Sequence, residues 1–457
     1  MGLAVSRELT ANCSSPLIVG LGSTGLSCAR YYQRKGLPFA VIDSRTKPPG
    51  LESLQQDCPQ ADIVLGGIDL PHLLAADCLV VSPGLALSEP AIAQALQQGV
   101  AVCSDIDLFV REARAPVVGI TGSNGKSTVT VLLGRMARRA GLNVAVGGNL
   151  GPPALDLLAD DVQLYVLELS SFQLERVGQL DLAVACILNM SADHLDRHGD
   201  MEHYHRAKQQ VFAGCSALVC NRDDALSQPL QMGALPRWEF GLGEPGANGF
   251  GIRLVAGEEW LCQGIDALMP VAEVRLVGRH NLANALAALA LGRALDLSMQ
   301  AMLDELREFG GLPHRCQWIA DVEGVHYIND SKATNPGATC AALPGLAAAS
   351  ALVLIAGGQG KDADFSDLCE SVVECCKAVV LIGEDAQLLE DSLGGRLPVA
   401  RASSMEVAVT VAAELAQAGD TVLLSPACAS FDMFSGFAAR GEAFVSSVKL
   451  LQAGGAA

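Results

Sequence analysis

The residues best suited to phosphate chemistry form the run TGSNGKST, from Thr121 to Thr128, directly after an apolar stretch. A glycine-rich turn between a strand and a helix offers backbone amides to a polyphosphate, while the lysine adds a cation and the serine a hydroxyl for Mg²⁺. Ile120 stands where the strict Walker pattern has its first glycine, so the loop is a shortened variant built on Gly122 and Gly125. The run predicts a site for the phosphates of a nucleotide.

Two groups of polar residues follow the next apolar runs. Glu168 ends the run YVLE, and a carboxylate at a strand end beside a phosphate loop is well placed to bind Mg²⁺. Farther along lies a cluster of acids and histidines: Asp193, His194, Asp196 and His198. Their spacing fits no standard zinc pattern. Lys208 lies on the helix expected after this cluster, where a lysine is most often a solvated surface residue.

A second glycine-rich turn, GLGSTG, contains Gly20, Gly22 and Gly25 and precedes Asp43, which ends the next apolar run. Such glycines let backbone amides approach a pyrophosphate, and the acid can bind a ribose hydroxyl. A nicotinamide-dependent oxidoreductase would explain this turn but would leave the TGSNGKST loop without a role. The turn could also be a tight connection that binds no ligand. A non-catalytic nucleotide-sensing protein would use only the phosphate loop.

Polar residues also follow three apolar runs in the C-terminal third. They are NDSKATN from Asn329 to Asn335, GGQGK ending at Lys361, and SPACASFDMFSGF with Ser430 and Phe437. Open α/β sheets bind ligands at the carboxyl ends of their strands, and loops dense in polar residues often carry function. A plain Asx-type turn would also explain NDSKATN.

The elements that must position these residues follow from the hydrophobic pattern. Short apolar runs alternate with helical stretches, which predicts parallel, doubly wound sheets. Short alternating pieces between Pro236 and Leu276 predict a small antiparallel ribbon; residues 280–309 are expected to be helical, and residues 310–313 a hinge. The expected fold class is α/β with three domains: a Rossmann-like domain at 1–114, a P-loop ATPase-like domain with the ribbon at 115–312, and a Rossmann-like domain at 313–457.

Composition narrows the possible partners. The chain has 457 residues, and its 31 Lys and Arg against 50 Asp and Glu give a net charge of −19. This balance argues against binding of nucleic acid or anionic membranes, which relies on clustered cations. The uncharged stretch 333–360 is interrupted by Pro336 and Pro344, so no membrane insertion is expected. No secretory signal pattern is found and the cysteines lie in apolar runs, as Cys78 and Cys186 do, so we expect reduced thiols and a cytoplasmic location.

Taken in order along the chain, these runs resemble the motifs of the Mur ligases. The matching runs are TGSNGKST, GGNLG, LELSSFQLE, DHLDRHG with a downstream lysine, HNLANALAA, PHR, NDSKATNP and SPACASFDMF. The sequences LSSFQLE and NDSKATN are similar to the motifs of the D-glutamate-adding branch. The resemblance implies an ATP-dependent ligase of peptidoglycan precursor synthesis that adds D-glutamate to UDP-N-acetylmuramoyl-L-alanine.

The resemblance also implies a role for individual residues. The UDP substrate is expected to contact Gly22, Ser23, Thr24, Asp43, Arg45, Ser82, Pro83 and Gly84, with Asn149 near its carboxylate. ATP is expected to contact Gly122, Ser123, Asn124, Gly125, Lys126, Ser127, Thr128, Asn281, Asn284, His314, Arg315, Asp330 and Lys332. D-Glutamate is expected at Thr334, Lys361, Ser430 and Phe437. Two Mg²⁺ ions are expected at Ser127, Glu168, His194 and Lys208, with Lys208 as a carbamate, and the catalytic set is Lys126, Glu168, His194 and Lys208.

The implied reaction begins with transfer of the γ-phosphoryl group of ATP to the substrate carboxylate, because a carboxylate is itself a poor electrophile. The amine of D-glutamate then attacks the acyl phosphate, and phosphate leaves. Catalysis of the first step is mainly positioning and charge neutralisation, to which Lys126 and Mg²⁺ contribute. Small molecules are the only partners that this reaction requires, and we expect a monomer.

Overall fold

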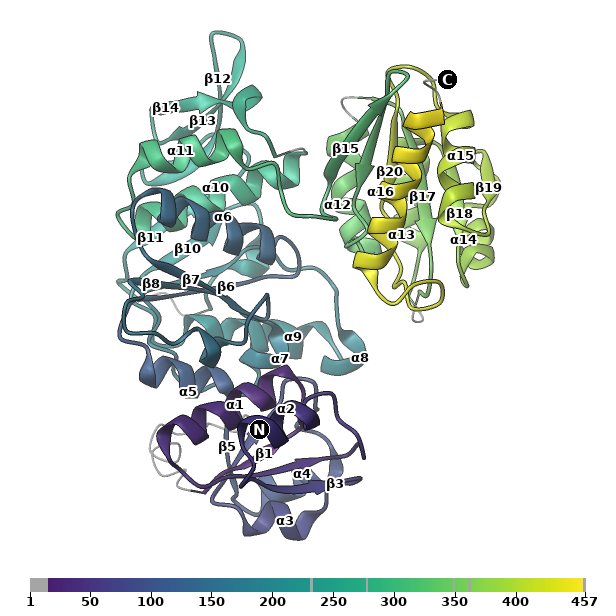
Figure 1. The fold of residues 1–457 in the computed structure, drawn as a ribbon. Helices are drawn as coiled ribbons and strands as arrows, with labels where there is room; N and C mark the ends of the chain where they lie inside the picture. Colours follow the sequence, from purple (N-terminus) through teal and green to yellow (C-terminus); the bar gives the residue numbers. More distant parts are fainter. Residues whose placement is uncertain (1–14, 231–232, 277, 348–349, 361–362, 455–457) are drawn as a thin grey trace. The chain divides into compact units, whose positions relative to one another are not determined.

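The computed structural model describes residues 15–230, 233–276, 278–347, 350–360 and 363–454. The strands of these residues form sheets of five, nine and six strands (Figure 1), an architecture that confirms the expected α/β class. The five-stranded sheet and most of the nine-stranded sheet belong to one compact unit, and the six-stranded sheet belongs to a second. Each unit is described by itself.

The five-stranded sheet has the order β3-β2-β1-β4-β5, with parallel pairing throughout. Its strands are β1 (Leu17–Val19), β2 (Ala40–Asp43), β3 (Asp62–Leu65), β4 (Cys78–Val81) and β5 (Ala101–Cys103), and its helices are α1 (Ser23–Lys35), α2 (Leu51–Asp57), α3 (Leu70–Ala75), α4 (Pro90–Gln97) and α5 (Asp105–Glu112). The strand order reverses at β1, which is where sheets of this kind bind ligands. The turn after β1 requires glycine, because a Cβ on Gly25 would lie 2.0 Å from the carbonyl oxygen of Gly20.

The nine-stranded sheet has the order β14-β13-β12-β11-β10-β9-β6-β8-β7. Its strands are β6 (Val117–Thr121), β7 (Val144–Gly148), β8 (Leu164–Glu168), β9 (Val184–Ile187), β10 (Leu218–Asn221), β11 (Arg237–Phe240), β12 (Gly249–Val255), β13 (Glu258–Gln263) and β14 (Asp266–Pro270). The helices of this region are α6 (Lys126–Arg139), α7 (Ser171–Leu174), α8 (Leu195–His198), α9 (Met201–Gln209), α10 (Arg279–Ala294) and α11 (Met299–Glu308).

The expected antiparallel ribbon is confirmed in part. A two-residue turn with positive φ at Ala256 and Gly257 joins β12 to β13, as in a tight hairpin. The prediction is wrong for β11, which pairs in parallel with both β10 and β12. The ribbon therefore begins only at β12, and β11 extends the parallel part of the sheet.

The six-stranded sheet has the order β15-β16-β20-β17-β18-β19, parallel except for the hairpin of β15 and β16. Its strands are β15 (Gln317–Val322), β16 (Val325–Asn329), β17 (Leu352–Gly357), β18 (Cys376–Ile382), β19 (Val399–Arg401) and β20 (Thr421–Leu424), and its helices are α12 (Pro336–Ala347), α13 (Ser366–Cys375), α14 (Ala386–Leu393), α15 (Met405–Leu415) and α16 (Phe437–Gly454). The described part of the uncharged stretch 333–360 contains the helix α12 and the strand β17.

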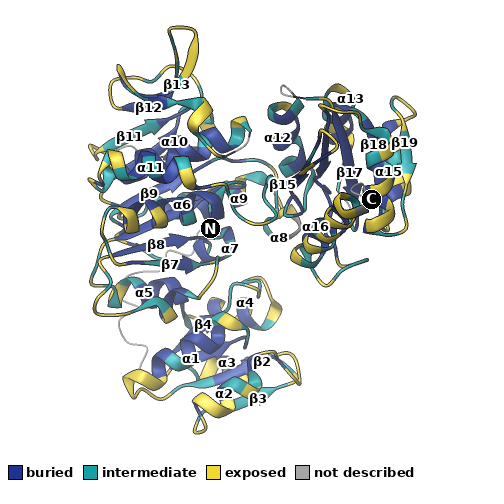
Figure 2. Cartoon of the chain, turned by 45° about the horizontal axis from the view of Figure 1, so that its top comes forward, coloured by how far each residue is buried: buried dark blue, intermediate teal, exposed yellow. Residues whose placement is uncertain are grey.

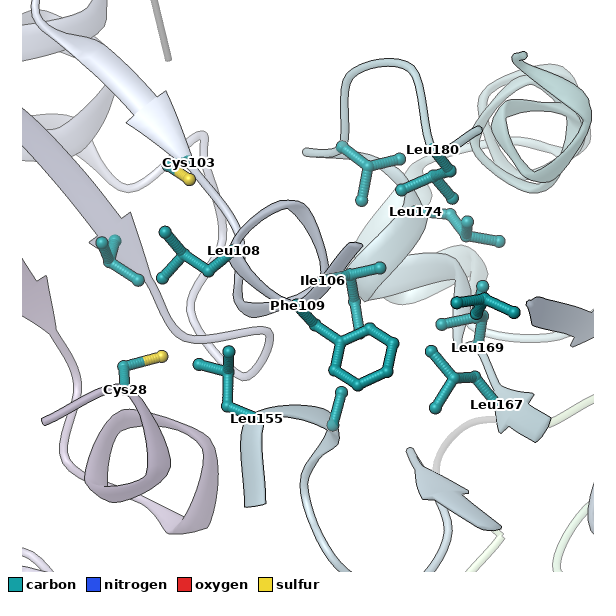
Figure 3. Packing of buried hydrophobic residues seen from close by; sticks show 14 of the residues in the cluster. Cys28, Cys103, Ile106, Leu108, Phe109, Leu155, Leu167, Leu169, Leu174 and Leu180 are labelled. Carbon is teal, nitrogen blue, oxygen red and sulfur yellow. The ribbon is translucent and has the colours of Figure 1, made fainter. Parts of the chain in front are cut away.

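Buried residues follow the strands and the inner faces of the helices (Figure 2). One hydrophobic cluster includes side chains from both the five-stranded and the nine-stranded sheets, among them Cys28, Phe109 and Leu167 (Figure 3). The Phe109 ring of α5 meets the Tyr165 ring of β8 edge to face, with 5.0 Å between centroids. The two sheets therefore share a core.

Two expectations drawn from composition can be compared with the structure. Cys186 is a buried free thiol, and burial raises its pKa. Cys78 was expected to be a free thiol as well, and this is wrong because it is disulfide-bonded. In the part of the chain that the structure describes, no helix has the length and apolar character needed to cross a bilayer.

Candidate active site

The TGSNGKST run connects β6 to α6, as its glycines predicted. Gly122 and Gly125 have φ values of 150° and 81°, which side chains with a Cβ rarely adopt. The turn directs the backbone amides at the start of α6 toward the position where a phosphate would bind. Lys126 Nζ donates hydrogen bonds to the carbonyl oxygens of Gly122 and Ser123, at 2.9 Å each. The Lys126 side chain thus folds back onto the backbone of its own loop.

Side chains from the strand end of β9 and from α9 hold this loop. Asn189 Oδ1 accepts from the amide of Asn124 at 2.8 Å, and its Nδ2 donates to the Asn124 carbonyl at 3.0 Å. The hydroxyls of Ser123 and Tyr204 are 3.0 Å apart. The sequence did not mark Asn189 or Tyr204, although Asn189 stands where a buried run turns polar. Both side chains fix the loop backbone in place.

Glu168 lies directly beside the phosphate loop, as expected from its place at the end of β8. Its side chain is buried, with only 3% exposed. Ser127 Oγ donates to Glu168 Oε2 at 2.5 Å, and Asn149 Nδ2 donates to Oε1 at 2.6 Å. A carboxylate and a hydroxyl are the oxygen ligands that Mg²⁺ prefers, so these groups fit the ion. The structure therefore brings together Ser127, expected to contact ATP, Glu168, expected to bind Mg²⁺, and Asn149, expected to contact the UDP substrate.

Lys208 is buried, and the interpretation of it as a surface residue is wrong. Its Nζ donates to the carbonyl of Gly122 at 2.8 Å and to Thr121 Oγ1 at 3.2 Å. Burial, together with the nearby charge of Lys126, lowers the pKa of Lys208 well below its usual value, although Glu168 and Asp193 act in the opposite direction. The amine therefore contacts the phosphate loop, and its burial disfavours the charged form.

The histidines of the DHLDRHG run have different surroundings. His194 has a φ of 55°, its side chain is about half exposed, and its Nε2 lies 3.6 Å from Asp193 Oδ2. His198 is buried, and its Nε2 pairs with Ser171 Oγ at 3.0 Å. The described residues contain no group of three or more His, Cys, Asp or Glu that could hold a metal ion. The side chain of Asp196 lies outside the described residues.

Asp43, the acidic residue beside the turn expected to bind UDP, is hydrogen-bonded within the protein. Asp43 accepts from the amide of Leu21 at 2.6 Å and from Arg45 Nη2 at 2.7 Å. Burial alone would raise the pKa of Asp43, but the hydrogen bonds from Arg45 and from the backbone outweigh it and lower the pKa to about 2. Ser82 Oγ donates to the carbonyl of Gly20 at 2.8 Å. The Asp43 carboxylate is therefore bonded to Arg45 and to the backbone through both of its oxygens.

The remaining members of this set lie beside the same turn. Gly22 and Gly84 face open space, because a Cβ on either would meet nothing within 4 Å. Ser23 and Thr24 begin α1, and Pro83 precedes Gly84 in the turn that follows β4. The backbone is therefore accessible at the points where a pyrophosphate would approach.

The other expected ATP contacts all belong to the second unit. Asn284 Nδ2 donates to Asn281 Oδ1 at 3.0 Å on α10. Asp330 accepts from Ser425 Oγ at 2.8 Å, and burial raises its pKa to about 6. Lys332 Nζ lies 4.1 Å from the centroid of the Phe437 ring, which is also near the His314 ring. Arg315, another expected ATP contact, precedes β15. Of the residues expected at D-glutamate, Thr334 precedes α12 and buried Ser430 follows β20. Lys361 lies outside the described residues.

Arg176, which the sequence did not mark, connects the two sheets of the first unit. Its guanidinium is buried and donates to carbonyl oxygens of the loop after β4, those of Val81, Ser82 and Leu85. Arg197, near His194, donates to the Leu85 carbonyl at 2.7 Å and shares Glu175 with Arg176. The loop expected to bind UDP is therefore bonded to the segments that follow Glu168 and His194.

Asp105 at the start of α5 is buried close to this arginine, and we expect Asp105→Asn to stabilise the fold at neutral pH. Burial raises its pKa to about 6, and Oδ1 has no hydrogen-bond partner among the described residues. Because the folded pKa exceeds the unfolded value, the free energy of unfolding falls as pH rises from about 4 to 6. An amide removes this cost, which is on the order of 2–3 kcal/mol above pH 6.

Urea unfolding of both proteins at pH 5 and pH 8 measures the effect of Asp105→Asn. The stabilisation should be larger at pH 8 than at pH 5. Equal effects at the two pH values, or destabilisation at pH 8, would contradict the role assigned to the buried charge.

Comparison with known proteins agrees with this geometry. Three family descriptions match: the N-terminal domain of the MurD-like Mur ligases at residues 14–104, the Mur ligase middle domain at 120–292, and the Mur ligase glutamate ligase domain at 314–428. UDP-N-acetylmuramoylalanine–D-glutamate ligase of Pseudomonas aeruginosa is 53% identical over 97% of this chain and 100% of its own length. The protein of the same name from Nitrosococcus oceani is 52% identical over 95% of this chain and 96% of its own length.

Solved structures share the fold at much lower identity. MurF from Acinetobacter baumannii aligns with a TM-score of 0.60 at 18% identity, over 94% of this chain and 93% of its own. UDP-N-acetylmuramate–alanine ligase from Thermotoga maritima aligns with a TM-score of 0.58 at 18% identity, over 95% of this chain and 99% of its own. The three matched domains and the relatives of near-equal length show that the chain belongs to the Mur ligases, within the branch of UDP-N-acetylmuramoylalanine–D-glutamate ligases.

Proposed function

We propose that the protein joins the amino group of D-glutamate to the carboxylate of UDP-N-acetylmuramoyl-L-alanine, with cleavage of ATP to ADP and phosphate. The contact of Glu168 with both Ser127 and Asn149 carries the proposal. Through this contact the end of the phosphate loop is next to the residue expected beside the acceptor carboxylate, so that phosphoryl donor and acceptor can react together. No residue of this cluster has a use in hydride transfer.

The chain's own groups account for the steps. The amides at the start of α6 and the ammonium of Lys126 hold the phosphates and neutralise charge that develops on the transferring group. Glu168 fixes the hydroxyl of Ser127 and the amide of Asn149 through its two oxygens. Mg²⁺, which Ser127 and Glu168 would hold, supplies Lewis-acid stabilisation of the phosphate oxygens. Attack of the D-glutamate amine on the acyl phosphate then releases phosphate.

ADP release in the presence of UDP-N-acetylmuramoyl-L-alanine tests the function directly. D-Glutamate should support turnover, whereas L-glutamate, meso-diaminopimelate and L-lysine should not. ADP release that ignores the amino acid, or a preference for one of the other three, would refute the proposal. Binding of NAD with reduction of a substrate would instead favour an oxidoreductase.

We propose further that Lys208 is carbamylated and serves as an anionic ligand. Its low pKa supports this, because only the neutral amine attacks CO₂. The amine nitrogen forms a bond to the carbon of CO₂, one electron pair moves to an oxygen, and the amine loses a proton to solvent. The product carries one negative charge and two oxygens in place of an ammonium that would repel Mg²⁺. With His194, it would complete a second Mg²⁺ site.

Lys361 and Ser430 are proposed to recognise D-glutamate, with Thr334 and Phe437. A lysine is a compact cation suited to a carboxylate, and a serine hydroxyl adds a directional donor. Lys361→Ala should raise the apparent KM for D-glutamate far more than the KM for ATP. Steady-state kinetics with each substrate varied in turn measure the difference. A loss of ATP affinity with unchanged D-glutamate affinity would show that the assignment of substrates is wrong.

We also propose that the enzyme is a cytoplasmic monomer that uses two Mg²⁺ ions. Its acidic composition and soluble small-molecule substrates support the location and the absence of other partners. Sedimentation should give the mass of one chain at all working concentrations. A concentration-dependent increase in mass would contradict the monomer.

A further inference from the structure

Three loops come together at one edge of the six-stranded sheet. They follow β16, β20 and β17, which are neighbouring parallel strands whose carboxyl ends lie at the same edge. The amide of Asp330 donates to the Leu424 carbonyl at 2.7 Å, and Gln359 and Ala429 exchange two backbone hydrogen bonds of 2.9 Å. The loops also carry residues proposed to bind D-glutamate, among them Ser430 and Thr334.

Arg440 of α16 bonds to the loops that follow β16 and β20 and to the last residue of β17. Its Nη2 donates to the Ser331 carbonyl at 2.8 Å, and its Nε donates to Ser331 Oγ at 3.0 Å. Its Nη1 donates to the carbonyl oxygens of Cys428 at 3.0 Å, Ala429 at 3.4 Å and Gly357 at 3.5 Å. The residue is only 1% exposed. Since a guanidinium has five N–H donors, almost all of them are used by the loops.

The Arg440 network also reaches the start of α16. Ser331 Oγ, which accepts from Arg440, donates to the carbonyl of Phe437 at 2.8 Å. The Phe437 ring in turn supports the ammonium of Lys332. The guanidinium therefore sets the backbone positions of Ser331, Ala429 and Phe437, each of which is adjacent to or part of the proposed amino-acid site.

The acceptors of Arg440 in these hydrogen bonds are neutral oxygens, and the nearby charge of Asp432 favours the protonated guanidinium. Burial lowers its pKa to about 10, which still leaves it protonated at neutral pH. A buried cation without a bonded anion is costly, and an anion that binds nearby reduces the cost.

We propose that Arg440 is a positioning residue that holds the loops after β16 and β20, and the end of β17, in the geometry of the amino-acid site. The inference rests on the proposed function, because that function places D-glutamate at these loops. Arg440 does not touch the substrate, since its donors are used by the loop carbonyls and Ser331.

Kinetics of Arg440→Met and Arg440→Lys test the proposal, with each of the three substrates varied in turn. Arg440→Met should raise the KM for D-glutamate by about 10- to 100-fold, the range expected when loop geometry shifts by about 1 Å. Arg440→Lys should recover part of this loss, because it keeps the charge without the fork of donors. The KM for the UDP substrate should change little, and the KM for ATP should change less than that for D-glutamate, because Ser331 lies between the expected ATP contacts Asp330 and Lys332.

The matched control is Arg401→Met, the same substitution in the same sheet at an exposed side chain that pairs with Glu390. It should leave all three KM values unchanged. Ser331→Ala removes one acceptor of Arg440 without changing charge. It should raise the KM for D-glutamate by a smaller factor, and should affect this KM more than the KM for ATP. It decides the question if the Arg440 variants do not fold.

The outcomes separate the inference from the function on which it rests. If the wild-type protein releases no ADP in response to D-glutamate, the proposed function fails. If the wild type is active but folded Arg440 variants keep its KM for D-glutamate, whatever their kcat, Arg440 is only structural. The inference is then overturned. The inference is also overturned if Ser331→Ala, tested alone, leaves this KM unchanged.

Discussion

Lys126→Ala should remove almost all turnover and leave the thermal unfolding midpoint close to that of the wild type. The ammonium neutralises charge on the transferring phosphoryl group, and loss of one such group costs about 3–4 kcal/mol, or 10²- to 10³-fold in kcat. The fold should survive, because the hydrogen bonds of Nζ described above join it only to carbonyls of its own loop, those of Gly122 and Ser123. ADP release and calorimetry on the same preparation measure both effects.

A lysine away from the site provides the matched control for Lys126. Lys35 pairs with Glu112 at 2.6 Å on the surface, and Lys35→Ala should retain full activity. Near-normal turnover in a folded Lys126→Ala protein would remove the argument from the phosphate loop.

Lys208→Ala should be almost inactive, and short carboxylates such as acetate or formate should restore part of the activity. The added carboxylate supplies the two oxygens that the carbamate provides in the wild type. Lys208→Met offers a second variant, because it fills the same buried space without nitrogen. It should be as inactive as the alanine variant but resist rescue, since its side chain occupies the space that the added carboxylate needs.

Other roles for Lys208 lead to different results. If the plain amine acts only by bonding to Thr121 and Gly122, activity falls but carboxylates restore nothing. A fully active alanine variant, together with a crystal structure that shows plain lysine, would exclude any role. Electron density for three extra atoms on Nζ would support the carbamate, whereas denaturing mass spectrometry is uninformative because carbamates decompose in acid.

The sequence was a good guide where local chemistry decides the structure. The glycines of TGSNGKST predicted the turn between β6 and α6, and the polar end of YVLE placed Glu168 beside it. The direction of β11 was not predictable in this way, because alternation along Arg237–Phe240 is the same for parallel and antiparallel pairing. Strand direction depends on which neighbours a strand finds, and those lie elsewhere in the chain.

Buried charges were the least predictable part of the site. Lys208 contacts Tyr204 of its own helix and Thr121, which is far from it in the sequence. Arg176 and Arg440 bond mostly to backbone carbonyls, which every residue has, so the sequence does not show where most of their partners lie. Only the folded chain shows which carbonyls converge on a guanidinium.

The core shared by the five-stranded and nine-stranded sheets has a consequence for any attempt to divide this enzyme. The segment before residue 115 resembles a complete nucleotide-binding module, yet Phe109 and Ile106 of α5 pack among Leu167, Leu169 and Leu174 (Figure 3). A fragment cut there would expose a large apolar surface and aggregate. Exchange of this segment between relatives therefore succeeds only if the leucines that face it are exchanged as well. For the same reason, both sheets should unfold in a single thermal transition.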